Sequence, residues 1–201
     1  MHRYGPSTAL LVVDVQNDFA DPAGSLYVRG GEQVVERVNA EVEGAVRDRA
    51  RVVCTQDWHP EHTPHFARDG GAWPVHCVAD TWGSALHPAL RVPDTITVIR
   101  KGANGEDGYS AFTMRDPVTG ATVPTALEPL LREAGVTDVV VAGLATDYCV
   151  KETALDARRL GFATTVLTDA VAAVDLQPGD GEAALAELRD QGVILARTQP
   201  A

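Results

Sequence analysis

Short apolar runs rich in β-branched residues alternate with longer stretches of helical periodicity along the whole chain, and this alternation limits the folds open to it. The apolar runs predict strands at residues 9–14, 52–55, 95–99, 139–143, 163–168 and 193–196. The amphipathic stretches predict helices at residues 32–50, 125–134, 147–161 and 179–191. Alternating strands and helices favour a parallel sheet covered on both faces. We therefore predict a Rossmann-like α/β fold, a three-layer αβα sandwich around a central, mostly parallel six-stranded sheet.

Composition and charge narrow the functional classes. The chain has 201 residues, which suits one globular domain over residues 1–201. Its formal net charge is −11, so neither a basic surface nor a nucleic-acid partner is expected. The sequence has no signal peptide and no apolar run near the ~20 residues of a membrane helix, which predicts a cytoplasmic protein without membrane contacts. The three cysteines are far apart, which argues against a disulfide framework, and Cys54 and Cys77 are interpreted as packing residues.

Several chemically active side chains fall at the carboxyl ends of predicted strands. Asp14, Asp57 and Lys101 each end or follow a strand, and the turn at residues 144–149 joins a strand to a helix. In open parallel sheets the ligand crevice lies beyond the carboxyl ends of the strands. These positions are therefore expected at one rim of the sheet, where they can form a site.

Cys149 lies near the start of the predicted helix 147–161, where the helix dipole favours an anion and would lower the pKa of the thiol. With Asp14 as proton carrier and Lys101 as the cation that tunes it, this thiol can hydrolyse an amide. Each residue also has a structural interpretation. Cys149 would then be a small core residue, Asp14 the cap of a turn and Lys101 a solvated charge.

Four of the six histidines cluster between residues 57 and 76. Asp57 and His59 are two residues apart, so in an extended segment they point to the same side. With His65 and His76 they provide one carboxylate and three imidazoles, a set that suits one divalent ion and that zinc, iron and manganese all accept. Of the three metals we expect zinc. His62 is left with an outer or surface role. The competing interpretation is a polar loop with scattered histidines.

The chain also carries six short motifs in a defined order. They are Val-Asp-Val-Gln-Asn-Asp-Phe (13–19), Thr-Gln-Asp-Trp-His-Pro (55–60), His-Phe (65–66), Trp-Pro-Val-His-Cys-Val (73–78), Arg-Lys-Gly (100–102) and Gly-Leu-Ala-Thr-Asp-Tyr-Cys-Val (143–150). In this combination they resemble the nicotinamidase/pyrazinamidase branch of the isochorismatase-like hydrolases. The first motif alone marks only the wider superfamily, whereas the whole set is specific to this branch.

The resemblance implies roles for the matching residues. It implies a triad of nucleophile, general acid/base and cation, formed by Cys149, Asp14 and Lys101. It implies a metal site formed by Asp57, His59, His65 and His76. It implies an oxyanion hole formed by the backbone N–H groups of Ala145 and Cys149, with a cis peptide bond between Leu144 and Ala145. Substrate contacts are expected from Phe19, Trp73 and Tyr109.

The implied reaction converts nicotinamide to nicotinic acid and ammonia through a thioester, with pyrazinamide as a second substrate and a place in NAD salvage. The residues alone would suggest attack by a metal-bound hydroxide, whereas the resemblance gives the ion the task of holding the pyridine nitrogen. Two alternatives stay open: another cysteine amidohydrolase of the superfamily, acting on an N-carbamoyl or ureido compound, or a non-catalytic metal-binding module. The number of subunits also stays open, a homo-oligomer included.

Overall fold

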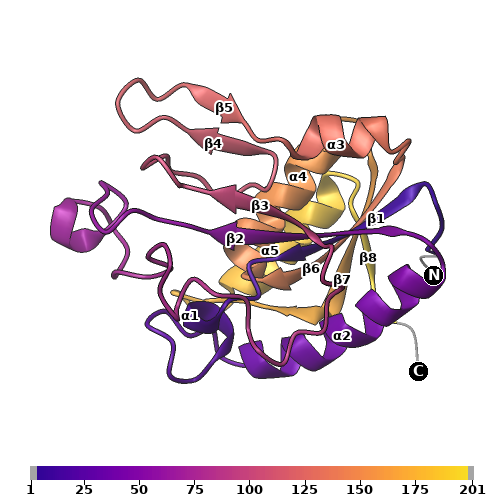
Figure 1. Ribbon diagram of the computed structural model, residues 1–201, viewed down its shortest axis with the longest axis horizontal. Helices are drawn as coiled ribbons and strands as arrows, with labels where there is room; N and C mark the ends of the chain where they lie inside the picture. Colours follow the sequence, from indigo (N-terminus) through magenta and orange to yellow (C-terminus); the bar gives the residue numbers. More distant parts are fainter. Residues whose placement is uncertain (1–3, 199–201) are drawn as a thin grey trace.

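The computed structural model describes residues 4–198 and confirms the predicted central sheet, whose six strands are all parallel (Figure 1). Three residues at each end of the predicted domain 1–201 lie outside this description. In spatial order the strands are β3 (Thr97–Lys101), β2 (Arg51–Asp57), β1 (Thr8–Val13), β6 (Asp138–Leu144), β7 (Ala163–Ala172) and β8 (Ile194–Ala196). The direction of winding reverses between β1 and β6, and ligands of open α/β sheets bind at such a point.

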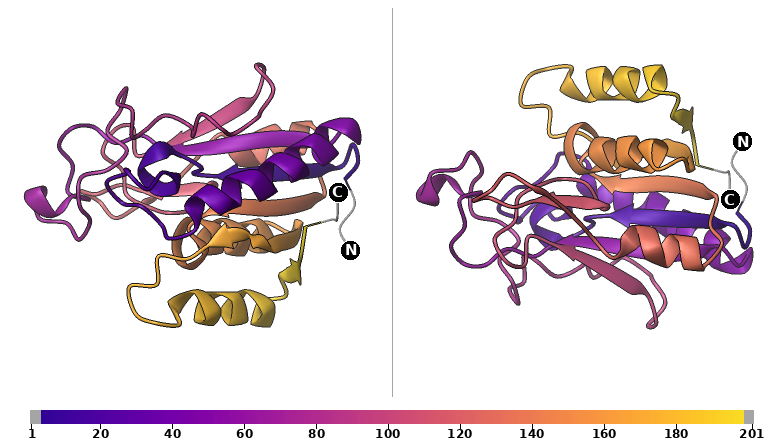
Figure 2. Two further views of the ribbon diagram at one scale, coloured as in Figure 1. Left: turned by 90° about the horizontal axis from the view of Figure 1, so that it is seen from below. Right: turned by 90° about the horizontal axis from the view of Figure 1, so that it is seen from above.

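Helices cover both faces of the sheet, which confirms the three-layer arrangement (Figure 2). One face carries α2 (Gly31–Arg47), and the other carries α3 (Leu127–Glu133), α4 (Lys151–Arg159) and α5 (Asp180–Asp190). In β1, Leu10 and Val12 pack with the valines of α2, whereas Leu11 and Val13 pack with the helices of the opposite face. Every residue of β1 is buried, as its apolar run predicts. Within residues 4–198, no helix has the length and apolarity required to cross a membrane.

The element boundaries agree with the sequence predictions to within a few residues, with three differences. The helix predicted from residue 147 begins with a π-helical turn, Thr146–Val150, before α4. β7 continues beyond residue 168 to Ala172. The short elements were not predicted, because they are too short to show a periodic pattern. They are α1 (Asn17–Ala20), a 3-10 turn (Ala67–Asp69) and the antiparallel pair β4 (Thr113–Arg115) and β5 (Thr122–Pro124).

The long connection between β2 and β3 is tied back to the carboxyl end of the sheet. The backbone N–H of His59 donates to the carbonyl oxygen of Cys77 at 3.0 Å, and the N–H of Ala79 donates to the carbonyl oxygen of His59 at 2.8 Å. The buried carboxylate of Asp18, just beyond β1, accepts a hydrogen bond from the N–H of Cys77 at 2.7 Å. These contacts hold the histidine-rich segment against the strand ends.

Candidate active site

Asp14, Lys101 and Cys149 meet at the carboxyl end of the sheet. Asp14 follows β1, Lys101 is the last residue of β3, and Cys149 lies in the π-helical turn after β6. The Nζ atom of Lys101 lies 2.7 Å from Oδ2 of Asp14 and 3.6 Å from Sγ of Cys149. One carboxylate oxygen of Asp14 lies within 4.8 Å of that sulfur. The arrangement provides a thiol with both a proton acceptor and a cation, as amide hydrolysis by a thiol requires.

The carboxylate of Asp14 is fully buried and held from two sides. The hydroxyl of Thr55 donates to Oδ1 at 2.5 Å, and Lys101 contacts Oδ2. The backbone N–H of Asp14 donates to the same Thr55 oxygen at 3.1 Å. Asp14 itself has a φ of 48°, a conformation that few non-glycine residues adopt. Its carboxylate is therefore fixed in orientation before any substrate arrives.

Burial and neighbouring charges set the protonation of the triad. Burial raises the pKa of Cys149 well above its ordinary value; Lys101 opposes this rise, while Asp14 and Asp57 add to it. The pKa of Cys149 is therefore raised and not lowered as expected, and desolvation is the largest cause of the rise. Burial also raises the pKa of Asp14, against the pull of Lys101. Burial disfavours the charge on Lys101, but Asp14 and Asp57 prevail and raise its pKa.

Asp57 connects the triad to the histidines. Its Oδ1 lies 2.8 Å from Nζ of Lys101, and its Oδ2 lies 4.0 Å from Nε2 of His59. Burial favours the neutral form, but Lys101 and the histidines outweigh it and lower the pKa of Asp57 to about 2. The side chain of Gln16 fixes the backbone of Asp57 through two hydrogen bonds of 2.8 Å. A single ionised carboxylate therefore belongs to both parts of the site.

The rings of His59, His65 and His76 are buried together, with one nitrogen of each within 4.8 Å of the others. Nδ1 of His65 lies 2.7 Å from Oδ1 of Asp107, and Nδ1 of His76 lies 2.7 Å from the carbonyl oxygen of Pro74. The other nitrogen of each ring is left to act as a ligand. Both ring nitrogens of His59 are buried without a hydrogen-bond partner among the residues that the structure describes.

This donor set fits a divalent metal ion. Burial lowers the pKa of His59 to about 4 and also lowers the pKa of His76, so both rings are neutral near pH 7, the form that binds metal. Buried polar atoms require a partner, and an ion would satisfy those of His59. Asp57 adds a carboxylate on the side of the cluster that faces Lys101. The structure thus brings together the three histidines predicted as ligands, and the fourth predicted ligand, Asp57, lies beside one of them, His59.

An aromatic pocket separates the thiol from the histidine cluster. Trp73 stacks against His65 with ring centroids 6.5 Å apart, and its Nε1 donates to the hydroxyl of Tyr109 at 3.0 Å. The ring centroids of Phe19 and His76 lie 5.5 Å apart. Aromatic walls of this kind suit a flat ring. The pocket is lined by Phe19, Leu26, Val28, Asp57, His65, Trp73, His76, Tyr109, Leu144, Ala145, Tyr148, Cys149 and Val174.

The turn after β6 brings backbone groups to the same pocket. The peptide bond between Leu144 and Ala145 is cis, as expected, and both Ala145 and Cys149 line the pocket. Gly143 makes the close approach of β6 to β1 possible, because a Cβ there would lie 2.1 Å from the carbonyl oxygen of Val13. The two residues expected to form the oxyanion hole therefore border the cavity that contains the thiol.

Three contributing residues were missed by sequence reasoning. Tyr148 directs its ring at Trp73 with centroids 4.9 Å apart, and its position next to Cys149 was an available indication. Thr55 lies two residues before Asp57 and so on the same side of β2. Asp107 could not be found, because it lies in an irregular loop and its partner His65 is 42 residues away in the sequence.

His62 lies outside the cluster. Its side chain is 72% exposed, and its Nδ1 contacts Asp69 at 3.1 Å. Of the two roles that the sequence left to it, the structure supports the surface one.

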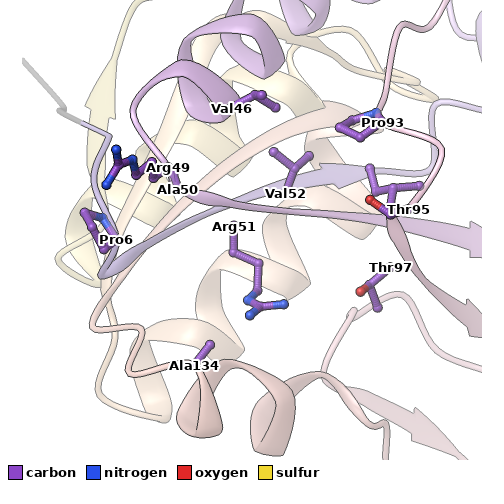
Figure 3. Close-up of a pocket in the computed structure, with 11 residues that line it drawn as sticks. Pro6, Val46, Arg49, Ala50, Arg51, Val52, Pro93, Thr95, Thr97 and Ala134 are labelled. Atoms are coloured by element: carbon purple, nitrogen blue, oxygen red, sulfur yellow. The ribbon is translucent and has the colours of Figure 1, made fainter.

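A second hollow lies at the opposite end of the sheet, by the amino ends of β2 and β3 (Figure 3). Its polar side chains come from Arg49, Arg51, Thr95 and Thr97. Neither the triad nor the histidine cluster borders this hollow within the described part of the chain. The triad and the histidine cluster therefore lie at the other end of the sheet, by the carboxyl ends of the strands.

Known proteins are similar to this chain in both sequence and fold. The isochorismatase domain family matches residues 8–200. The nicotinamidase of Escherichia coli is 37% identical over 206 residues, covering 94% of each chain. The crystal structure of the pyrazinamidase of Pyrococcus horikoshii in complex with zinc has a TM-score of 0.85 and 37% identity, covering 96% of this chain and 99% of that one. The crystal structure of PnC1 from L. infantum in complex with nicotinate has a TM-score of 0.88 and 40% identity, covering 98% of this chain and 96% of that one.

The fold and the cysteine-centred site, together with these likenesses, define the class: the chain belongs to the isochorismatase-like hydrolase family. Within that family it belongs to the nicotinamidase/pyrazinamidase branch, which confirms the resemblance of its motifs.

Proposed function

We propose that this protein hydrolyses nicotinamide to nicotinic acid and ammonia, and pyrazinamide by the same route. The observation that carries the proposal is the contact of Lys101 with both Asp14 and Cys149, across an aromatic pocket from three buried imidazoles. Relatives support the choice of substrate, since one is a nicotinamidase and another was solved in complex with nicotinate.

Asp14 carries the proton in both halves of the reaction. It takes the thiol proton of Cys149 as Sγ attacks the carboxamide carbon, and the N–H groups of Ala145 and Cys149 stabilise the oxyanion. The C–N bond then breaks, Asp14 gives the proton to the departing nitrogen, and ammonia leaves a thioester behind. Asp14 next takes a proton from water as the water oxygen attacks the thioester. The C–S bond breaks, the proton returns to sulfur, and nicotinic acid is released.

The electrostatics of the pocket support this order of events. A thiol with a raised pKa stays neutral until the acceptor and the electrophile are both in place. Asp14, whose pKa burial raises, is a stronger base than an exposed carboxylate. Lys101 keeps its charge and stabilises the thiolate as it forms.

We also propose that the four predicted ligands hold one divalent ion, zinc or else iron or manganese. They are Asp57, His59, His65 and His76. When bound, the ion supplies a coordination position for a ring nitrogen of the substrate. A ring nitrogen meta to the carboxamide is common to nicotinamide and pyrazinamide. The substrate ring is held by Phe19, Trp73 and Tyr109, which directs the carboxamide toward Cys149.

The proposal includes a setting for the reaction: one catalytic domain over residues 1–201, in the cytoplasm, within NAD salvage. The three cysteines are free and buried, a state that a reducing compartment maintains. Every group proposed for the site comes from a single chain, so a homo-oligomer would repeat the site and is not required to complete it.

Ammonia release from nicotinamide by metal-replete protein tests the triad. Cys149→Ala is expected to lower kcat by about 10⁴-fold or more, because the nucleophile is lost. Cys54→Ala, which removes a buried thiol outside the site, is the matched control and should keep the wild-type rate. Absence of ammonia from the wild type, or a wild-type rate from Cys149→Ala, would overturn the proposal.

His59→Ala tests the proposed task of the ion separately. The variant is expected to lose bound metal and to bind nicotinamide more weakly, which metal analysis and the KM for nicotinamide would report. Full activity in a His59→Ala protein without metal would leave the triad in place and remove the metal from the proposal.

A further inference from the structure

Asp107 contacts the histidine cluster from outside the pocket. Its Oδ1 lies 2.7 Å from Nδ1 of His65. The side chain of His65 is 6% exposed, whereas that of Asp107 is 47% exposed. One carboxylate thus reaches solvent on one side and a buried imidazole on the other. Because Nδ1 is occupied by this contact, Nε2 is the nitrogen of His65 left to face the cluster.

The backbone fixes Asp107 in this place. Its N–H donates to the carbonyl oxygen of Arg115 at 2.8 Å, and the N–H of Arg115 donates back at 2.5 Å. The N–H of Gly108 donates to Oδ1 at 2.8 Å, and Gly108 has a φ of 129°, which favours glycine. Asp107 is therefore attached to β4 and is not a freely rotating surface acid.

The three imidazoles differ in their outer partners. His65 faces a carboxylate, His76 faces the carbonyl oxygen of Pro74, and His59 has no hydrogen-bond partner within residues 4–198. An outer carboxylate fixes the tautomer and orientation of a metal-binding imidazole and makes it a stronger donor. His65 is therefore the ring with the strongest outer support.

We propose that Asp107 is a positioning residue for the metal. It holds His65 with Nε2 toward the ion and strengthens that ring as a ligand. The inference rests on the metal site of the proposed function and extends it to a residue outside the ligand set. Asp107 acts through His65 and touches neither the substrate nor the reacting sulfur.

Two variants and a matched control separate this role from a general effect of the loop. Asp107→Asn keeps an acceptor oxygen but removes the charge, and Asp107→Ala removes both. Asp69→Asn is the control, because Asp69 contacts His62, an exposed histidine outside the cluster, in the same kind of pair. Metal-free proteins are titrated with zinc against a chromophoric chelator. Cobalt-loaded proteins report the ligand field by absorption, and circular dichroism checks folding.

Zinc affinity is expected to fall by about 10- to 100-fold in Asp107→Ala, the usual effect of losing an outer partner. The zinc affinity of Asp107→Asn should lie between those of Asp107→Ala and the wild type, and its cobalt spectrum should be altered. Asp69→Asn should match the wild type in both measurements. Folded Asp107 variants that bind zinc as tightly as the wild type would overturn the inference and leave the proposed function standing. A wild type that binds no zinc would overturn both the metal site and this inference, so the two failures are distinguishable.

Discussion

Lys101 is one of two lysines in the chain, and it is the more deeply buried. Its side chain is 1% exposed, and its ammonium lies within 2.8 Å of both Asp14 and Asp57. A compact ammonium can contact two carboxylates and a sulfur that lie in different directions, which the planar fork of arginine does not do. Lys101 therefore keeps two buried negative charges compatible with folding while it also faces the thiol.

Replacement of Lys101 by methionine tests this dependence. Lys101→Met leaves Asp14 and Asp57 buried without their cation, so the free energy of unfolding is expected to fall by about 3–5 kcal/mol. Lys151→Met is the control, because the ion pairs of Lys151 with Glu152 and Glu187 are partly exposed to solvent, so the substitution should change stability by less than about 1 kcal/mol. Urea unfolding measures both. Equal stability of Lys101→Met and the wild type would contradict the argument.

At the scale of elements, the site depends on how closely β1 and β6 approach at their carboxyl ends. Gly143 pairs with Val13 in the parallel register of the two strands and has a φ of 120°. The strand ends carry Asp14 on one side and the turn that leads to Cys149 on the other. The spacing of these two strands thus sets the separation between general base and nucleophile.

Gly143→Ala is expected to destabilise the protein and to reduce activity together. The added Cβ would meet the backbone of Val13, and an L-residue at positive φ adds strain, so we expect a loss of at least about 2 kcal/mol. Gly135→Ala separates the two effects, because Gly135 also has a positive φ of 69° but has open space for a Cβ. Thermal and urea unfolding should show the smaller loss for Gly135→Ala; equal losses would mean that the approach of the strands is not tight.

The helices and strands that could be predicted from the sequence are those with a periodic pattern, and the site residues that could be predicted are those that directly follow a strand. Asp14 and Cys149 could be placed at one rim because parallel strands deliver their carboxyl ends together. Asp107 and the pair β4–β5 could not, because a few residues in an irregular loop carry no period. The pKa of Cys149 was expected in the wrong direction because local sequence shows the helix start but neither the burial nor the approach of Asp14 and Asp57.

At the scale of the whole molecule, all three thiols are buried. Cys54 lies within β2 in the core, and burial, with a contribution from Asp14, raises its pKa from 9.0 to about 12. Below pH 9 the thiol of Cys54 is neutral in both the folded and the unfolded protein, so its burial is fully compatible with folding. Above pH 9 the unfolded chain loses this proton first, so stability declines until the folded thiol also ionises near pH 12.

Alkaline unfolding of Cys54→Ala measures this contribution. Between pH 7 and about pH 10, the wild type should lose about 1.4 kcal/mol more of its unfolding free energy than Cys54→Ala, which corresponds to one pH unit above the ordinary pKa of one thiol. Urea titrations in a reducing buffer at the two pH values give the difference. Parallel declines in the two proteins would show that Cys54 ionises equally in the folded and unfolded states.

Asp57 contacts Lys101 through one oxygen and faces His59 through the other. A cation taken up by the imidazoles would therefore compete with the Lys101 ammonium for one negative charge. Coupling between two binding equilibria is reciprocal. If metal binding changes the free energy of protonation of a triad residue, protonation of that residue changes the free energy of metal binding by the same amount. Metal binding and the titration of the triad are then linked equilibria. A substitution in the metal site would change the pKa values of the triad, and a substitution in the triad would change the metal affinity.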